Sequence, residues 1–399
     1  MEGLKILQDK SLQDMPAIVI VAFNRPHALE RLLQSIVSAD FMRFDNIPMV
    51  ISIDKSDCKE VYEVADGFLW PFGPKTVVRH QKHLGLREHI LACGELSAEY
   101  GSVIILEDDL FVARTFYEYA VQAMDFYQKD NNVCGISLYA YDFNEHAQLV
   151  FYPLDDGYDN YFIQTPSSWG QLWTKSQWQD FQKWYQNNRG PVTEHDPLPD
   201  SAISWPESSW KKYFTKYMVL EKKYFVFPRS SLTTNFGDIG THYLKPNSNY
   251  QVPLQIIGKQ YTFSHLEDSK SIYDSHFEIQ PECLKPFNFQ LKSFDFECDL
   301  YGTKNLKKIK SDFLLTIREC KSSILSYGSG LLPQELNIIF NRSGHFFHLA
   351  RLSACRGLQR KKRLIQLKSL NKNYGIKKEG LILFYDILRS LKRREKFEV

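Results

Sequence analysis

The strongest constraint on the fold is a repeated alternation of short apolar runs and helical segments in the first 140 residues. The run PAIVIVAF at residues 16–23 is continuous and rich in β-branched residues, which is typical of a buried parallel strand. The segment that follows has apolar residues at helical spacing, with Asn24 as a candidate cap and Pro26 in the first turn. This strand and helix predict a β-α unit.

The same pattern recurs, which predicts an α/β fold with a doubly wound, Rossmann-like sheet and right-handed crossovers. Further strands are expected at residues 48–54, 75–80, 102–106, 133–140 and 223–228, and further helices at 86–100 and 113–130. Ligands of such sheets bind beyond the carboxyl ends of the strands. Arg25, Asp54 and the acid triplet Glu107-Asp108-Asp109 all follow predicted strands, so we expect them at one edge.

The acid triplet needs a positive partner, because adjacent carboxylates repel and their burial is costly. A hard divalent cation held by carboxylate oxygens, Mg²⁺ or Mn²⁺, would supply that charge and leave positions open for phosphate oxygens. The alternative is a strand end with solvated acids, and the triplet alone does not separate the two. The sequence has no Walker A or G-x-G-x-x-G loop that would offer another phosphate site.

The charge of the chain is asymmetric, although the net value is only +2. Residues 351–399 contain 15 Lys+Arg against 4 Asp+Glu, in two segments that combine apolar stripes with basic clusters. This pattern predicts basic helices that face an anionic membrane surface. Nucleic acid is disfavoured, because no base-reading motif accompanies the charge.

Cysteine usage and the N-terminus indicate a compartment. The seven cysteines form no C-x-x-C pair, which favours free thiols in a reducing environment. The first apolar run has no basic segment before it and is too short to span a membrane. We therefore expect a cytoplasmic protein, peripheral on the inner face of the plasma membrane.

Several segments resemble one family in the right order. VIILEDDLFVARTFYEY (103–119) resembles the metal-binding segment of the N-acetylglucosaminyltransferase I type and its bacterial relatives, which are inverting, nucleotide-sugar-dependent glycosyltransferases of the GT-A fold. The other matching segments are VIVAFNRP (19–26), VISIDKSD (50–57), SSWGQLWTKSQW (167–178), SWPESSW (204–210) and TNFGDIGTH (234–242). Five ordered matches are far more specific than any one motif.

The resemblance implies a donor site. Asp109 is the implied ligand of Mn²⁺ or Mg²⁺, and TNFGDIGTH is the implied loop that closes over the diphosphate. The implied donor contacts are Arg25, Asp54, Arg87, Glu107, Asp108 and His242. His89, beside Arg87, is expected at the surface of its helix.

The resemblance also implies an acceptor site, formed by Trp169, Gly170 and Trp205. The family places its general base after a tryptophan, where this chain has Pro206, so the next residue, Glu207, is the candidate base, with Asp200 as the second choice. Trp169, Trp173, Trp205 and Trp210 could each stack on a sugar face, although core packing is the more typical role of each one taken singly.

Three regions follow from these assignments. Residues 1–140 are expected to be the nucleotide-sugar-binding half of a GT-A domain and 141–330 its acceptor-binding and catalytic half. Residues 331–399 are expected to be a basic helical C-terminal extension.

The implied activity is metal-dependent, inverting transfer of a hexosyl or N-acetylhexosaminyl group. The expected donor is a nucleotide-diphosphate sugar, most simply a UDP-sugar, and the expected acceptor is a glycan or lipid-linked glycan in bacterial surface polysaccharide synthesis. Two alternatives stay open at this point. One is a catalytically inactive nucleotide-sugar or carbohydrate-binding protein of the same fold, and the other is a nucleotide-sugar pyrophosphorylase or hydrolase.

Overall fold

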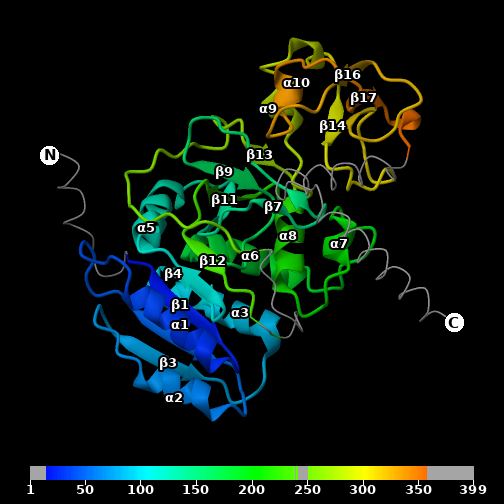
Figure 1. Ribbon diagram of the computed structural model, residues 1–399. Coiled ribbons are helices and arrows are strands. Elements are labelled where there is room, and N and C mark those ends of the chain that lie inside the picture. The colour runs from blue at the N-terminus through cyan, green and yellow to red at the C-terminus, as the bar shows by residue number, and fades with distance from the viewer. Residues whose placement is uncertain (1–14, 239, 241–249, 357–399) are drawn as a thin grey trace, which may run out of the picture.

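The structure is a computed structural model that describes residues 15–238, 240 and 250–356 (Figure 1). Its centre is a nine-stranded sheet in the order β13-β9-β11-β6-β10-β4-β1-β2-β3. The strands are β1 (Ala17–Ala22), β2 (Met49–Ile53), β3 (Lys75–Arg79), β4 (Ser102–Glu107), β6 (Val133–Ser137), β9 (Asn160–Ile163), β10 (Gln171–Thr174), β11 (Tyr224–Pro228) and β13 (Ile272–Tyr273). Strands β1 to β4 run parallel, and β10 lies antiparallel between β4 and β6. The predicted α/β class is confirmed.

Helices cover both faces of the sheet. One face packs against α1 (Pro26–Val37), α2 (Lys59–Gly67) and α5 (Phe116–Tyr127), and the other packs against α3 (Gly85–Glu95), α6 (Lys175–Asn187) and α8 (Trp210–Leu220). Along β1, Ile18 and Ile20 belong to the core cluster that includes α1, α2 and α5. Val19 and Val21 belong to the cluster on the other face, which includes α3, α6 and α8. Both faces of β1 are therefore buried, which explains why its sequence is a continuous apolar run.

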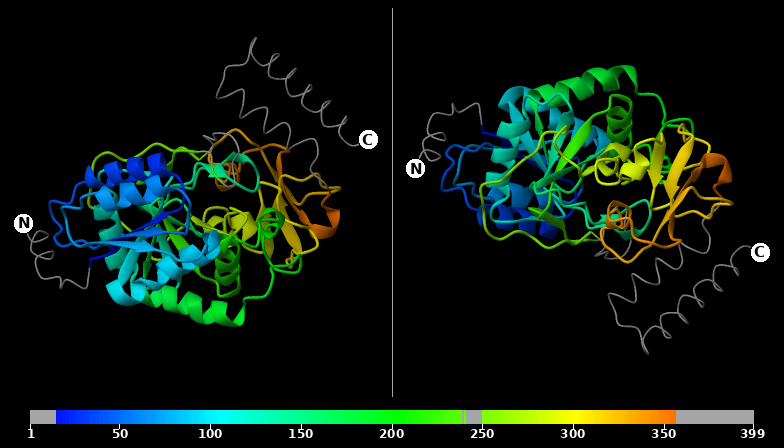
Figure 2. Two further views of the ribbon diagram at one scale, coloured as in Figure 1. Left: turned by 90° about the horizontal axis from the view of Figure 1, so that it is seen from below. Right: turned by 90° about the horizontal axis from the view of Figure 1, so that it is seen from above.

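A smaller four-stranded sheet follows in the chain, with the order β14-β15-β17-β16. Its strands are β14 (Phe296–Asp299), β15 (Phe313–Thr316), β16 (Leu325–Tyr327) and β17 (Phe347–Arg351), with α9 (Pro281–Leu284) and α10 (Leu336–Ile339) beside them. In both views of Figure 2 this C-terminal unit lies at the opposite end of the molecule from β3 and α2. It shares a core cluster with the main sheet, because Tyr327 and Leu349 belong to the same cluster as Val19.

The predicted helical extension is wrong for residues 331–356. Helical structure there is limited to one turn of α10 and a 3-10 turn at Leu352–Ala354, and the segment FHLAR forms β17. Asn341 adopts a positive φ of 46°, which ends the helical path. Beyond it, the chain at Gly344 lies so close to Gly328 that a Cβ at Gly344 would meet the Gly328 backbone at 2.5 Å. Phe347 and Leu349 are buried on one side of β17, so the apolar spacing belongs to a strand and not to a helix. Residues 357–399, with the rest of the predicted basic helices, lie outside the described residues.

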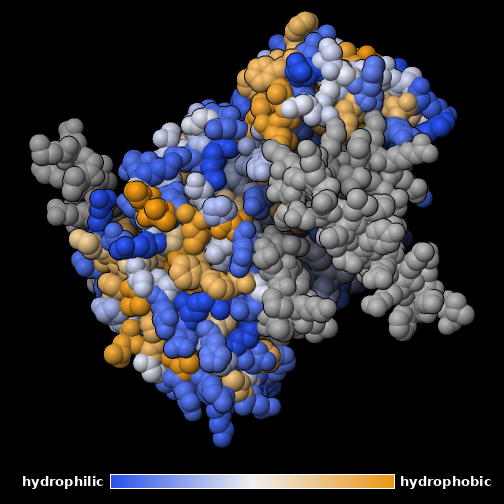
Figure 3. Space-filling model, viewed as in Figure 1, coloured by the Kyte–Doolittle hydropathy of each residue, from blue (hydrophilic) through white to orange (hydrophobic). Residues whose placement is uncertain are grey.

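The surface seen in Figure 3 alternates between hydrophobic and hydrophilic patches. Ile256 and Ile257 are strongly exposed on the loop after β12 (Thr233–Asn235), but isolated apolar side chains are common on protein surfaces. Within the part of the chain that the structure describes, no helix is both long and apolar enough to cross a membrane.

Candidate active site

The acid triplet lies at the carboxyl end of β4, beside the end of β1. Glu107 is the last residue of β4, and Asp108 and Asp109 form the turn into β5 (Leu110–Val112). Because Val21 of β1 pairs with Glu107, the short connection from β1 to α1 passes beside the acids, and Arg25, the residue before α1, lies next to them. Its guanidinium forms ion pairs with Asp108 and, at 3.1 Å, with Asp109. The positive partner within the chain is therefore Arg25.

One guanidinium does not balance three carboxylates. Burial raises the pKa of Asp108 to about 6 despite the attraction of Arg25. Desolvation by the surrounding protein, together with the charge of Asp109, raises the pKa of Glu107 to about 8. Burial is the main cause of both shifts, so the ionised form of these acids is disfavoured at this turn unless a further cation comes with it.

The acids fit a metal ion that arrives with a diphosphate. Among the described residues, no three His, Cys, Asp or Glu side chains are already arranged as a metal cluster. Mg²⁺-type sites commonly use only one or two carboxylates, and the substrate phosphates complete the coordination. Asp109 suits that role, because its side chain is 18% exposed while that of Asp108 is 4% exposed.

The segment predicted to close over the diphosphate begins directly beside the acids. Strand β12 pairs with β5, and the Phe236 amide donates to the Asp109 carbonyl at 3.0 Å. Asp238 forms an ion pair with Arg31, whose guanidinium lies 3.9 Å from the centre of the Phe236 ring. A Cβ on Gly240 would meet the Arg25 guanidinium at 3.1 Å. The loop therefore passes over Arg25, while His242 lies outside the described residues.

Asp54 follows β2 at the same edge, as predicted. Its carboxylate accepts hydrogen bonds from the backbone amides of Lys55, Leu84 and Gly85 at 2.8–2.9 Å and lies 3.0 Å from His83 Nδ1. Burial would raise the pKa of Asp54, but these amides outweigh it and hold the pKa below its ordinary value. In this structure Asp54 fixes the turn that begins α3.

The prediction of a surface position for His89 is wrong. His89 is buried against the sheet, where its Nε2 lies 2.8 Å from Ser52 Oγ. Burial lowers its pKa to about 4. The reason is that α3 turns this position toward β2, so His89 serves the core while Arg87 points outward and donates to the Glu207 carbonyl at 2.7 Å.

The predicted acceptor residues Trp169 and Gly170 lie at the same edge as the acids. Strand β10 pairs antiparallel with β4, with Gln171 opposite Ile105, and Trp169 precedes β10 at the edge where β4 ends with Glu107. Gly170 has a φ of 95°, and a Cβ there would meet Thr233 at 2.9 Å and Leu106 at 3.3 Å. Glycine is therefore required for Trp169 to reach the edge.

The two predicted base candidates are each held by a lysine. Glu207 accepts from Lys212 Nζ at 2.8 Å through Oε1 and from the Tyr213 hydroxyl at 2.6 Å through Oε2. The hydrogen bonds from Lys212 and Tyr213 lower the pKa of Glu207. Asp200, at the start of the short helix α7 (Asp200–Ile203), lies 3.3 Å from Lys308 of the C-terminal unit. Trp173 and Trp210, in contrast, are core residues, as expected.

Sequence analysis missed a buried ion pair beside Trp169. Lys211 Nζ lies 3.0 Å from Glu145 Oε1, and it also lies 5.2 Å and 5.0 Å from the ring centres of Trp169 and Trp205. The available signal was the pair Lys211-Lys212 in a helix rich in aromatic residues. The structure therefore links Trp205, the third predicted acceptor residue, to Trp169 through a lysine.

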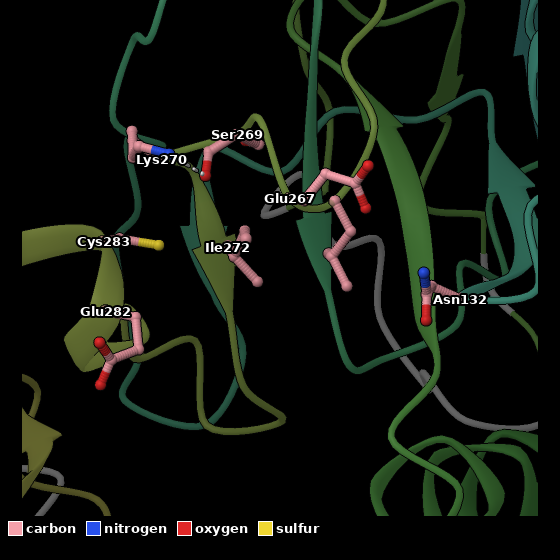
Figure 4. A pocket seen from close by; sticks show the side chains of 8 residues that line it. Asn132, Glu267, Ser269, Lys270, Ile272, Glu282 and Cys283 are labelled. Atoms are coloured by element: carbon pink, nitrogen blue, oxygen red, sulfur yellow. Dashed lines mark hydrogen bonds between the residues drawn. The ribbon is translucent and has the colours of Figure 1, made fainter.

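A pocket of about 330 Å³ lies elsewhere (Figure 4). Its lining includes Asn132, which precedes β6, Ile272 of β13, and Glu282 and Cys283 of α9. Because Asn132 is at the amino end of β6, this pocket is at the opposite edge of the sheet from the acids. It is not part of the candidate active site.

Comparison with known proteins agrees with this geometry. Residues 17–177 match the family described as glycosyl transferase family 2. An alpha-1,3-mannosyl-glycoprotein 2-beta-N-acetylglucosaminyltransferase from Arabidopsis thaliana is 22% identical over 275 residues. That alignment covers 64% of this chain and 54% of the relative, so the chain spans about half the length of the relative it matches.

Two solved structures are among those to which part of the chain is similar. GalNAc-T7 with UDP, GalNAc and Mn²⁺ has a TM-score of 0.38 at 14% identity, over 55% of this chain and 43% of that one. S. aureus TarS has a TM-score of 0.35 at 12% identity, over 55% of this chain and 60% of that one.

The family match covers the segment from β1 through β10, including the acid triplet and Trp169. The layered sheet is the α/β class of fold that the sequence predicts. Residues 17–177 are therefore similar to glycosyl transferase family 2.

Proposed function

We propose that this protein is a metal-dependent glycosyltransferase that moves a sugar from a nucleotide-diphosphate donor to a glycan or lipid-linked glycan acceptor. One observation carries the proposal. In a chain that is similar to family 2 over residues 17–177, Arg25, the acid turn and the loop that begins at Phe236 meet at the carboxyl edge of the sheet. Such an edge is where α/β sheets bind nucleotides.

The donor side follows from the charges at this edge. Asp109 would hold a divalent cation, Mn²⁺ or Mg²⁺, together with the diphosphate of the donor. When bound, that ion would neutralise the charge that develops on the leaving diphosphate. A cation at Asp109 would weaken the ion pair between Asp109 and Arg25. Arg25 would then be a second positive group for the diphosphate. Glu107 and Asp108 would face the sugar and ribose, and Asp54 and Arg87 the nucleoside.

The acceptor side would be formed by Trp169, whose ring stacks on Tyr250 with the centroids 4.5 Å apart, and by Trp205, on which a sugar ring can stack. A single carboxylate would take the proton of the acceptor hydroxyl, and direct attack would invert the anomeric centre, by the logic of inverting glycosidases. Glu207 and Asp200 are the candidates from the sequence. Glu207 accepts hydrogen bonds from Lys212 and Tyr213, and Asp200 lies 3.3 Å from Lys308.

The cellular setting belongs to the same proposal. A UDP-sugar is the simplest donor, because the relative named above is an N-acetylglucosaminyltransferase. The basic sequence of residues 351–399 supports attachment to an anionic, cytoplasmic membrane face, where a lipid-linked acceptor in bacterial surface polysaccharide synthesis would be met. Removal of these residues should lower binding to phosphatidylglycerol vesicles.

A donor screen tests the proposal. UDP-GlcNAc, UDP-Glc, UDP-Gal and GDP-Man are added with Mn²⁺ or with EDTA, and thermal unfolding and nucleotide release are both measured. A transferase gives Mn²⁺-dependent stabilisation by one donor and nucleotide release that an acceptor glycoside accelerates. Stabilisation without release would support the inactive binding protein instead. Release that no acceptor accelerates would support a hydrolase.

A further inference from the structure

Two adjacent lysines of α8 make different ion pairs. Lys212 donates to Glu207 at 2.8 Å and to the carbonyl of Trp205, also at 2.8 Å. It therefore anchors the turn SWPESSW to the helix. Lys211 contacts both carboxylate oxygens of Glu145, at 3.0 Å and 3.4 Å. The two glutamates, Glu145 and Glu207, can be compared directly because each is held by one of these neighbouring lysines.

The Lys211–Glu145 pair lies beside the donor edge. Lys211 Nζ is within 5.2 Å of the centre of the Trp169 ring, and Trp169 precedes β10 at the edge where the paired strand β4 ends with Glu107, the first acid of the triplet. The charge of Lys211 also acts on Glu107 and lowers its pKa, against the stronger effect of burial. The pair thus lies between the acid turn and Trp205.

Glu145 is held on a fixed turn. It follows β7 (Phe143–Asn144), which pairs with β8 (Leu149–Val150), and the Asn144 side chain accepts from the amides of His146 and Ala147 at 2.9 Å and 3.0 Å. The Glu145 side chain is 11% exposed. A carboxylate in this position is oriented by the protein but remains within reach of a bound molecule, as a catalytic group requires.

We propose that Glu145 is the general base of the transfer and that Lys211 is its positioning residue. This inference rests on the proposed function. The acceptor oxygen uses a lone pair to form the new bond to the anomeric carbon, and its proton passes to a Glu145 carboxylate oxygen. The bond between the anomeric carbon and the diphosphate oxygen breaks, and its electron pair leaves with the nucleoside diphosphate.

Solvent exposure distinguishes Glu145 from the sequence candidates. The side chains of Glu207 and Asp200 are 55% and 63% exposed, so water has free access to both. Glu145 instead is 11% exposed and is paired with Lys211, whose Nζ lies 5.2 Å and 5.0 Å from the ring centres of Trp169 and Trp205, so less water reaches its carboxylate.

Glu145 is ionised at neutral pH. Burial would raise its pKa, but the Lys211 ammonium has the strongest opposing effect, and with His146 and the Tyr141 hydroxyl it holds the pKa below the ordinary value. A base must be unprotonated to accept a proton. Loss of the Lys211 charge should therefore let burial protonate Glu145 at higher pH.

Matched glutamine variants test the base. Glu145→Gln and Glu207→Gln are compared for UDP release from UDP-GlcNAc with Mn²⁺, in water and with octyl glycosides of glucose, galactose and mannose. Binding of UDP-GlcNAc with Mn²⁺ is measured by calorimetry in each. We expect Glu145→Gln to lower the release rate by ~10²–10⁴-fold with near-parental donor binding, and Glu207→Gln to change it by less than ~10-fold.

Two results would overturn the assignment. Near-parental UDP release by Glu145→Gln would exclude it as the base and leave the proposed function standing. If the parent protein itself bound no UDP-GlcNAc with Mn²⁺, the proposed function for this donor would fail, and the assignment of Glu145 with it. Far-ultraviolet circular dichroism and thermal unfolding of Glu145→Gln identify a loss of activity that comes from misfolding.

Lysine variants provide the second measurement. In Lys211→Met the acid limb of the rate–pH curve should move to higher pH, and Lys211→Arg should restore its position by returning the positive charge. Lys212→Met is the control, because it removes the neighbouring ammonium, and its acid limb should not move. If the acid limb of the rate–pH curve did not move in Lys211→Met, the positioning role of Lys211 would be contradicted. A merely structural role of Lys211 would instead lower the rate equally at every pH.

Discussion

The amide of Phe236 donates to the carbonyl of Asp109 at 3.0 Å. This hydrogen bond joins the acid turn to the loop that passes over Arg25, two segments that are far apart in the sequence. The start of this loop is therefore fixed by a hydrogen bond to the backbone of Asp109, the proposed metal ligand.

Removing Arg25 should destabilise the metal-free protein. In Arg25→Met the carboxylates of Asp108 and Asp109 lose their cation, and an uncompensated buried charge costs about 3 kcal/mol. Urea unfolding with EDTA measures the loss. Arg31→Met is the control on the same helix, since its pair with Asp238 is more exposed and should be worth less than ~1 kcal/mol. Equal losses in the two variants would contradict the special role of Arg25.

Asp109→Asn should abolish Mn²⁺-dependent donor binding. The amide keeps the size of the side chain but removes the charge that would hold a divalent cation. Calorimetry of UDP with Mn²⁺ should show binding in the parent and at least ~10-fold weaker binding in the variant. Asp66→Asn is the control. It breaks a surface ion pair with Arg79 of β3 and should bind UDP with Mn²⁺ as the parent does. Unchanged binding in Asp109→Asn would place the ion elsewhere.

Gly170→Ala should destabilise the sheet edge below Trp169. A non-glycine residue at a φ of 95° is strained, and the new Cβ would meet Thr233 at 2.9 Å, so we expect a cost of about 2 kcal/mol or more. Gly190→Ala is the control, because a Cβ there meets no atom within 4 Å. Urea unfolding compares the two, and a similar stability for both would contradict the close approach.

Glu335 should make the protein less stable as the pH rises. It is fully buried beside α10, and burial raises its pKa from 4.5 to about 7. The folded state therefore holds a proton that the unfolded state releases, so stability falls between pH 4.5 and about 7. The loss should approach about 3 kcal/mol. Glu335→Gln should remove this slope in unfolding experiments from pH 4.5 to 8, whereas Glu282→Gln at an exposed site should retain it.

An oxidant should join Cys320 to Cys355. These residues form an antiparallel bridge at the edge of the C-terminal unit, and their Sγ atoms lie 3.7 Å apart. Treatment with oxidised glutathione should produce one internal disulfide, detected by peptide mapping and lost in Cys320→Ser. The closed loop should stabilise the unit by about 3–4 kcal/mol. Mixed disulfides with glutathione alone would show that the two thiols do not meet.

Features that depend on local patterns along the chain could be predicted from the sequence. Features that depend on contacts between distant segments could not. The β-α units were predictable because both faces of β1, β2 and β4 are buried, which makes each strand a continuous apolar run with no alternative use. The position of the acids followed from the same rule, because residues after parallel strands share one edge. Trp169 and the loop that starts at Phe236 were predicted from the order of the motifs, because no apolar periodicity indicates a functional role for either.

The incorrect predictions concern segments whose environment is set by distant parts of the chain. The apolar spacing near Leu349 fits a helix or a strand, and pairing with β15 and β16 decided for the strand. His89 has the sequence context of a surface residue, but the rotation of α3 turned it toward Ser52.

The sequence by itself determined the layered α/β fold, the edge at which the acids gather and the similarity of residues 17–177 to glycosyl transferase family 2, because these depend on local apolar patterns and on motifs. Only the tertiary structure decided which charges meet. Arg25 reached the acids through the pairing of β1 with β4, and Lys211 reached Glu145 through the packing of α8 against the turn between β7 and β8. Ion pairs depend on distances of a few ångströms between segments remote in the chain, and residue types along one sequence do not specify those distances.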